Sequence, residues 1–91
     1  MNGRFVRGDA LDALESDGEA LLLLPPDRVV RLSPIATMIF NSASSAVSLE
    51  DLAPVVEERF GPPAGRAIAE AVSEIVDGLV AVGALELAPD V

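Results

Sequence analysis

Residues 9–34 read DALDALESDGEALLLLPPDRVVRLSP, a stretch that predicts a β-meander leading into a helix. The dipeptide Asp17-Gly18 lies between two apolar runs, which is a strong hairpin signal because glycine adopts positive φ without steric cost. A second turn is expected at Pro25-Pro26-Asp27, ahead of a short β-branched run. We therefore expect three antiparallel strands, over residues 10–15, 19–24 and 28–32.

The middle strand of this meander contains four consecutive leucines, Leu21-Leu22-Leu23-Leu24. Apolar and polar residues do not alternate there, and such a run is typical of a strand buried on both faces. The alternative is that one of these leucines is simply exposed. Upstream, residues 4–7 (RFVR) form either a short strand or an ordered lead-in to the hairpin.

Two helices are expected directly after the meander. The first begins at Ser33-Pro34, because serine caps a helix and proline suits its first position. The second begins at Ser48, with acidic residues in its first turn, and stops at Gly61. Pro54 falls beyond that first turn, so it predicts a kink or a late start.

A third helix is indicated from residue 63 or 64 to Val82, where Gly83 stops it. Its apolar residues recur at helical spacing, which gives one continuous face. Gly78 is unfavourable inside a helix, so it predicts a close approach by another backbone. Residues 84–87 alternate and return as a short strand.

The chain of 91 residues predicts one domain with a single packed core, since 51% of it is hydrophobic. It has no cysteine, histidine, lysine, tyrosine or tryptophan, and all six basic residues are arginine. These absences exclude thiolate, imidazole and lysine chemistry, so we expect a protein that is not an enzyme and has no cofactor. The net charge of −9 argues against binding nucleic acid.

Membrane insertion is not expected, because no apolar run approaches the length of a transmembrane helix. The N-terminus lacks the pattern of a signal peptide, so a cytoplasmic location is the default. The acidic series Glu70, Glu74 and Asp77 could bind a divalent cation weakly. A solvated helix face explains it better, and we expect no metal site.

Two arginines, Arg28 and Arg31, flank Val29-Val30 on the expected third strand. One interpretation is edge protection, because charge on an exposed strand discourages aggregation. The other is an edge kept open for a peptide whose acidic groups would pair with the arginines. In a meander the third strand has one neighbour only, so both interpretations stay open.

The order of motifs resembles the PqqD-like family, which includes the pyrroloquinoline quinone biosynthesis protein D and the recognition elements of ribosomally made peptide pathways. That family has a D-G-E-A-V-L-L strand, a strand ending R-L-N-P, a helix with I-W and a closing G-L-L/V-E. The matching stretches here, within residues 9–87, are 17–23 (DGEALLL), 31–34 (RLSP), 39–40 (IF), 47–52 (VSLEDL), 58–61 (ERFG) and 83–86 (GALE).

This sequence departs from the family pattern at a few positions. Ser33 replaces the usual asparagine, and Phe40 stands where tryptophan is common. The turn Pro25-Pro26-Asp27 lacks the family's glycine, and Val29-Val30 replaces residues that are commonly aromatic. If those aromatics shape a pocket, the peptide preference of this protein differs.

The resemblance implies an α+β fold of winged helix-turn-helix type, with a three-stranded meander followed by three helices. It also implies that a leader peptide adds as a strand between the third strand and the third helix and is presented to a radical SAM enzyme, cyclase or protease. The residues carried over to this role are Arg28, Val29, Val30, Arg31, Leu32, Ile68, Val72, Ile75 and Val76.

Two other classes of function remain open. The same strand edge could pair with a second copy or a partner enzyme, which would make the chain an interaction or dimerisation module. A winged-helix transcriptional regulator needs a basic recognition helix, whereas the expected third helix carries Arg66 against three acidic residues.

Overall fold

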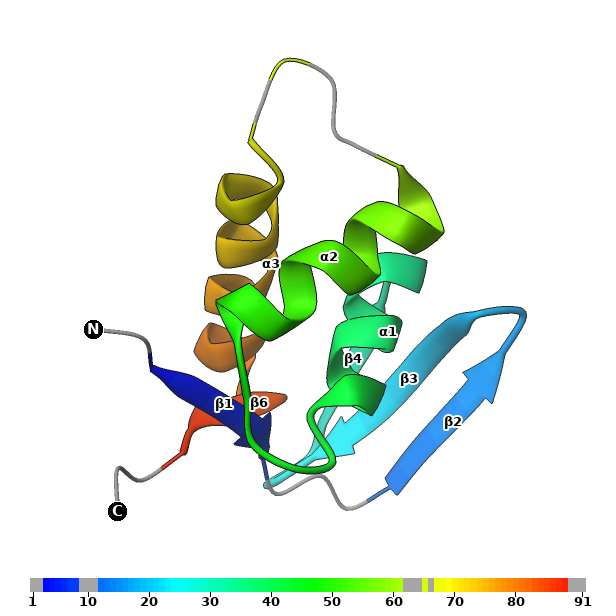
Figure 1. Cartoon of the computed structure of the whole chain (residues 1–91). Coiled ribbons are helices and arrows are strands. Elements are labelled where there is room, and N and C mark those ends of the chain that lie inside the picture. Colours follow the sequence, from blue (N-terminus) through cyan, green and yellow to red (C-terminus); the bar gives the residue numbers. More distant parts are fainter. Residues whose placement is uncertain (1–2, 9–11, 62–64, 66, 89–91) are drawn as a thin grey trace.

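The computed structural model describes residues 3–8, 12–61, 65 and 67–88. This part of the chain is an α+β structure with two small antiparallel sheets of three strands and three helices (Figure 1). The elements are β1 (Arg4–Arg7), β2 (Asp12–Ser16), β3 (Glu19–Leu24), β4 (Arg28–Leu32), α1 (Pro34–Ser42), β5 (Val47–Ser48), α2 (Leu49–Phe60), α3 (Ile68–Val82) and β6 (Leu85–Leu87).

The larger sheet has the strand order β2-β3-β4, which confirms the predicted meander. Its first turn is Asp17-Gly18, with φ angles of 53° and 80°, as the Asp-Gly signal predicts. The register pairs Leu14 with Leu21 and Leu23 with Val29. Residues directly opposite one another share a face, so these four side chains lie on the same side of the sheet.

The prediction that the leucine run is buried on both faces is wrong. Leu22 and Leu24 are 0% and 1% exposed, whereas Leu21 and Leu23 are 44% and 38% exposed. The helices lie against one face of the β2-β3-β4 sheet (Figure 1), so successive leucines alternate between the core and the surface.

The smaller sheet has the order β5-β1-β6, so its central strand is the N-terminal RFVR segment. Phe5 is paired with Val47 on one side and Leu87 on the other, and it is 9% exposed. Directly after β1, the Gly8 backbone N–H donates to the Ala84 carbonyl at 2.9 Å. The N-terminal segment is therefore a strand, and the predicted C-terminal strand is present as β6.

Both predicted starts of the first two helices are confirmed. The Ala36 N–H donates to Ser33 Oγ at 3.2 Å and caps α1. Ser48 and Asp51 form a reciprocal capping box at the start of α2. Since α2 continues from its start through Pro54, the alternative of a late start is wrong, and Gly61 ends the helix as predicted.

The third helix begins later than the sequence predicts. Residues 62–64 and 66 lie outside the described part, but Gly65 has φ of 70° and Ala67 is the extended residue that precedes α3. Neither conformation belongs to a right-handed helix, so the start moves to Ile68. The predicted end is confirmed, because Gly83 closes α3 in the left-handed region with φ of 89°.

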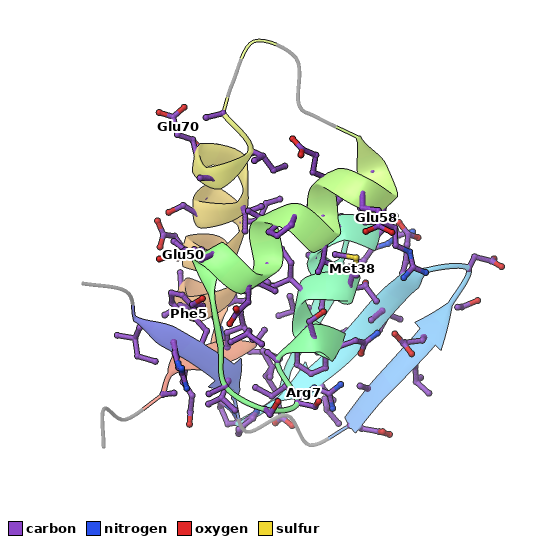
Figure 2. The ribbon with its side chains drawn as sticks, in the orientation of Figure 1. Phe5, Arg7, Met38, Glu50, Glu58 and Glu70 are labelled. Atoms are coloured by element: carbon purple, nitrogen blue, oxygen red, sulfur yellow. The ribbon has the colours of Figure 1, made fainter. Side chains whose placement is uncertain are left out.

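The core lies between the larger sheet and the three helices, and Ile39, Val72 and Val76 are among its fully buried side chains. At its margin, the Arg7 guanidinium lies 4.6 Å from the centre of the Phe40 ring. The acidic side chains labelled in Figure 2 point away from this core; they are Glu50, Glu58 and Glu70. Within the described ranges no helix combines the length and the apolar character needed to cross a bilayer.

Candidate functional site

Strand β4 is an edge of the larger sheet. It pairs antiparallel with β3 from Arg28 opposite Leu24 to Leu32 opposite Ala20, and the described residues place no strand along its other side. Alternate residues of a strand direct their N–H and C=O groups to opposite sides. Half of the β4 backbone groups therefore face away from β3.

A groove of about 300 Å³ runs beside this edge, between β4 and α3. The two β4 side chains that share the inner face, Val30 and Leu32, form one wall. The two outward-facing residues of β4 differ from each other. Val29 is 67% exposed and lies outside the groove, whereas Arg31 contributes to its lining. The remaining lining residues are Arg31, Ser33, Ala36, Ile75, Gly78, Leu79 and Val82.

Gly78 gives the α3 wall an open position. A Cβ built on it would have no heavy atom of another element within 4 Å, so the side-chain space at this residue is empty. The prediction that Gly78 marks a close approach by another backbone is not met within the described chain. Its cost to the helix, roughly 1 kcal/mol relative to alanine, is not offset by packing there.

Arg28 is not free for a ligand in this structure. Its Nη2 donates to the Val82 carbonyl at 2.7 Å, a bond between residues 54 apart that ties the start of β4 to the end of α3. Positive charge is favourable at a helix C-terminus, where the last carbonyls lack helical partners. Arg28 thus holds the end of α3 against the start of β4, although it is not one of the groove's lining residues.

Arg31 has a different environment on the outer side of β4. Its Nη2 lies 3.2 Å from Glu19 Oε1, with side-chain exposures of 75% and 41%. An exposed pair of this kind contributes little to stability. Both arginines therefore have a partner within the protein. The two interpretations of the sequence, edge protection and peptide pairing, had assumed that neither did.

The predicted α3 residues divide into core and groove. Ile75 lines the groove, whereas Val72 and Val76 are 0% exposed and belong to the core. Ile68 packs partly buried against the core and is not part of the groove lining. The predicted peptide contacts through Val72 and Val76 therefore have no surface to make them. The lining residues that the sequence prediction missed are Ser33, Ala36, Gly78, Leu79 and Val82.

For the missed residues on α3, the signal was present in the sequence. Ile75, Leu79 and Val82 recur at helical spacing around Gly78, so a glycine interrupts one apolar stripe. Whether such a stripe is core or groove depends on what covers it, and that is a property of the tertiary structure. Val72 belongs to the same stripe but is buried in the core.

The acidic groups of the described residues form no metal centre. No set of three or more acidic side chains within them is arranged to hold a metal ion, and Glu70, Glu74 and Asp77 are exposed. The one resolved perturbation is at Asp51, whose pKa is lowered because its carboxylate accepts a hydrogen bond from the Ser48 N–H.

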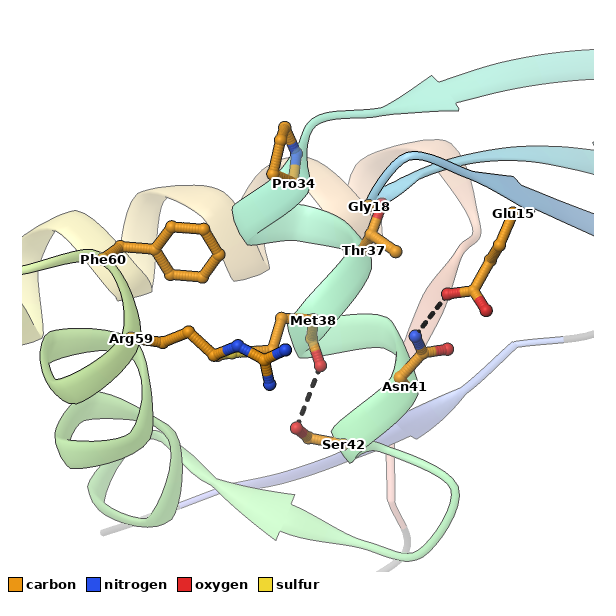
Figure 3. A pocket seen from close by; sticks show the side chains of 9 residues that line it. All are labelled: Glu15, Gly18, Pro34, Thr37, Met38, Asn41, Ser42, Arg59 and Phe60. Atoms are coloured by element: carbon orange, nitrogen blue, oxygen red, sulfur yellow. Dashed lines mark hydrogen bonds between the residues drawn. The ribbon is translucent and has the colours of Figure 1, made fainter.

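A second hollow of about 510 Å³ lies between α1, the end of α2 and the β2–β3 turn (Figure 3). Phe60 and Met38 supply apolar surface, and the Arg59 side chain extends into it. At its far end Asn41 Nδ2 donates to the Glu15 carboxylate. It shares no lining residue with the groove beside β4 and borders no part of that strand.

Comparison of the chain with protein-family models, with curated proteins and with solved structures found no match.

Proposed function

We propose that this protein binds the leader segment of a ribosomally made precursor peptide as an added strand along β4. It then presents the bound peptide to a modifying enzyme such as a radical SAM protein, a cyclase or a protease. In this proposal the fold is a variant of the winged helix-turn-helix, as the resemblance to the PqqD-like family implies. The protein itself contributes binding and positioning and carries out no catalytic step.

The observation that carries this proposal is the groove of about 300 Å³ beside the edge of β4 that no described strand pairs with. Strand addition needs both the groove and the free strand edge. Free backbone groups on an edge supply hydrogen bonds, and pockets for alternate side chains supply selectivity. Every second side chain of a strand added here would point toward Val30, Leu32 and α3.

The apolar lining sets the chemistry of the peptide. Ile75, Leu79 and Val82 offer no hydrogen-bonding side chain, so the inward residues of the bound strand are expected to be apolar. The open position at Gly78 accommodates one larger side chain. On the outward side, the exposed Arg31 guanidinium retains donors that an acidic peptide residue can use.

Two variants of α3 test the groove directly. We expect Gly78→Leu to fill the open position and to weaken peptide binding at least tenfold, or about 1.4 kcal/mol. Gly78→Ala adds only a methyl group in open space and should bind within about threefold of the wild type. Ala69→Leu is the matched control, since Ala69 is exposed on the opposite side of the same helix.

The measurement is an amide NMR titration of labelled protein with the leader half of the precursor peptide encoded beside it. Shifts concentrated in residues 28–32 and 75–82 are the expected result, together with loss of binding in Gly78→Leu. Shifts confined to the hollow at Arg59 and Phe60 would overturn the strand-addition proposal. So would the absence of shifts at about 100 μM peptide, which puts Kd near 1 mM or weaker.

A further inference from the structure

The outer face of the larger sheet carries an uncovered apolar cluster. Its members are Leu14, Leu21, Leu23 and Val29, which are 66%, 44%, 38% and 67% exposed. They account for four of the seven large hydrophobic side chains that the described residues leave exposed. The register makes them neighbours, since Leu14 is opposite Leu21 and Leu23 is opposite Val29.

An antiparallel sheet with one face in water normally presents polar residues on that face. Here the outward positions of the central strand after Glu19 are both leucine, and each outer strand adds one more aliphatic side chain. A hollow of about 490 Å³ lies against the Leu14–Leu21 pair. A contiguous apolar patch of this kind marks an interaction site.

Charged residues occupy two opposite corners of this cluster. One row across the sheet reads Asp12, Leu23, Val29, and the next row on the same face reads Leu14, Leu21, Arg31. Asp12 and Arg31 therefore lie at diagonally opposite corners, and Leu14 and Val29 occupy the other two. The arrangement combines an apolar diagonal with one acidic and one basic corner.

This pattern is complementary to itself. A two-fold axis that lies parallel to the face and passes over Leu14 and Val29 stacks each of these residues on its own copy. The same rotation brings Asp12 of each molecule toward Arg31 of the other. With rows ~6.6 Å apart and strands ~4.8 Å apart, the rotated positions coincide to within about 4 Å, and the strands of the two sheets cross steeply, as in orthogonal sheet packing.

Both corner residues keep the capacity for this contact. Asp12 Oδ1 accepts from the Ala13 N–H at 2.8 Å, which leaves its second oxygen for another donor. The pair of Arg31 with Glu19 is exposed, and a guanidinium has further N–H groups.

We propose that the outer face, defined by Asp12, Leu14, Leu21, Leu23, Val29 and Arg31, is a self-association surface that pairs with a second copy of this chain face to face about a two-fold axis. The proposal does not depend on peptide binding: it leaves the β4 backbone edge and the α3 wall of the groove uncovered, and Arg31 is the one residue of this face that also lines the groove. The face measures roughly 14 by 16 Å, small beside the ~800 Å² per partner of a stable complex. The net charge of −9 also opposes association, so the dimer is in equilibrium with the monomer.

The test is sedimentation equilibrium of the full chain from about 10 μM to about 1 mM, with three charge variants at constant salt. Asp12→Arg and Arg31→Asp each place like charges across the interface, so each should weaken dimerisation at least fivefold. The double variant restores opposite charges and should recover most of the loss. Leu21→Thr should weaken dimerisation without changing the fold, which the amide spectrum at low concentration checks.

The charge variants separate this interface from general repulsion. Asp12→Arg makes the chain less acidic, so if net charge alone governed association this variant would strengthen it while Arg31→Asp weakened it. That opposite pattern would overturn the proposal, and so would a wild-type monomer throughout the concentration range. A dimer insensitive to Leu21→Thr and to all three charge variants would place the interface elsewhere, for example at the β4 edge, and would also overturn it.

Discussion

The two sheets of this molecule have the same number of strands but are built in different ways. The larger sheet comes from one continuous stretch, residues 12–32, in which each strand pairs with its neighbour in sequence. The smaller sheet joins three distant segments, with Phe5 paired to both Val47 and Leu87. Tight turns fix the strand pairing of the larger sheet, whereas the pairing of the smaller sheet depends on the tertiary structure.

The two sheets therefore have different roles in the molecule. The smaller sheet ties the N-terminal segment to the end of the chain, and β1 lies at its centre. Among the residues that the structure describes, nothing pairs with the outer edge of β4 or covers the outer face of the larger sheet. Changes in the smaller sheet should therefore affect stability first, whereas changes at the surface of the larger sheet should affect binding.

The largest expected effect is at Gly8, where the chain leaves the smaller sheet. A Cβ on Gly8 would lie 2.2 Å from the Gly83 carbonyl oxygen, a backbone atom that cannot turn aside. We expect Gly8→Val to lower the free energy of unfolding by more than about 4 kcal/mol, measured by urea denaturation. Gly3→Ala is the control, because its Cβ would be 3.8 Å from Leu87. A Gly8→Val protein as stable as this control would contradict the described packing.

The next effect distinguishes the two faces of β3. Leu22 is 0% exposed and Leu21 is 44% exposed, although they are adjacent in one strand. Leu22→Ala should cost about 3 kcal/mol through lost burial and the cavity it leaves. Leu21→Ala should cost less than about 1 kcal/mol, with both values taken from denaturant midpoints at equal slope. Similar losses for the two variants would show that the outer face is covered.

The contrast between the sheets also explains how far the sequence could predict the fold. The Asp17-Gly18 turn and the Ser33 and Ser48 caps are local signals, and each predicted element is present. The pairing of β1 with β5 and β6 depends on contacts between residues about 40 to 80 positions apart, for which no local signal exists. The prediction that the leucine run is buried on both faces failed for the same reason. Only the tertiary structure decides whether a second layer covers the outer face of the sheet.

The site was predicted to a similar extent. Of the residues named from the sequence, Val30, Arg31, Leu32 and Ile75 line the groove, because strand order and helical spacing are readable, whereas Arg28 and Val29 do not. Their contact with a peptide stays a prediction. The sequence did not indicate that Arg28 caps α3, since its partner Val82 is 54 residues away and accepts through a backbone carbonyl. Any residue has such a carbonyl, so no sequence pattern marks it.

A third prediction compares the two arginines of β4, one tied to α3 and one not. Arg28→Met keeps the aliphatic stem but loses the bond to the Val82 carbonyl, so it should cost about 1 kcal/mol. Arg31→Met loses only an exposed pair with Glu19 and should stay within about 0.5 kcal/mol of the wild type. Thermal unfolding at fixed pH measures both. A larger loss for Arg31→Met would reverse the assignment of the two roles.

The smallest effect lies where the smaller sheet meets α2. Ser48 ends β5 and caps α2, and the Ser48 N–H holds the pKa of Asp51 below its ordinary value. Because the folded-state pKa is lowered, this contact stabilises the protein above about pH 4 and is lost as the pH falls through the folded value. Ser48→Ala keeps the backbone N–H but removes the hydroxyl, which is the second cause of the lowered pKa of Asp51. It should therefore cost about 0.5–1 kcal/mol at pH 7 and slightly less at pH 2–3. Ser33→Ala is the matched control, since the first turn of α1 has no acidic residue and its cost should not vary with pH in this range. Equal pH profiles for the two cap variants, measured by urea denaturation from about pH 2 to pH 7, would contradict the coupling of Asp51 to this junction.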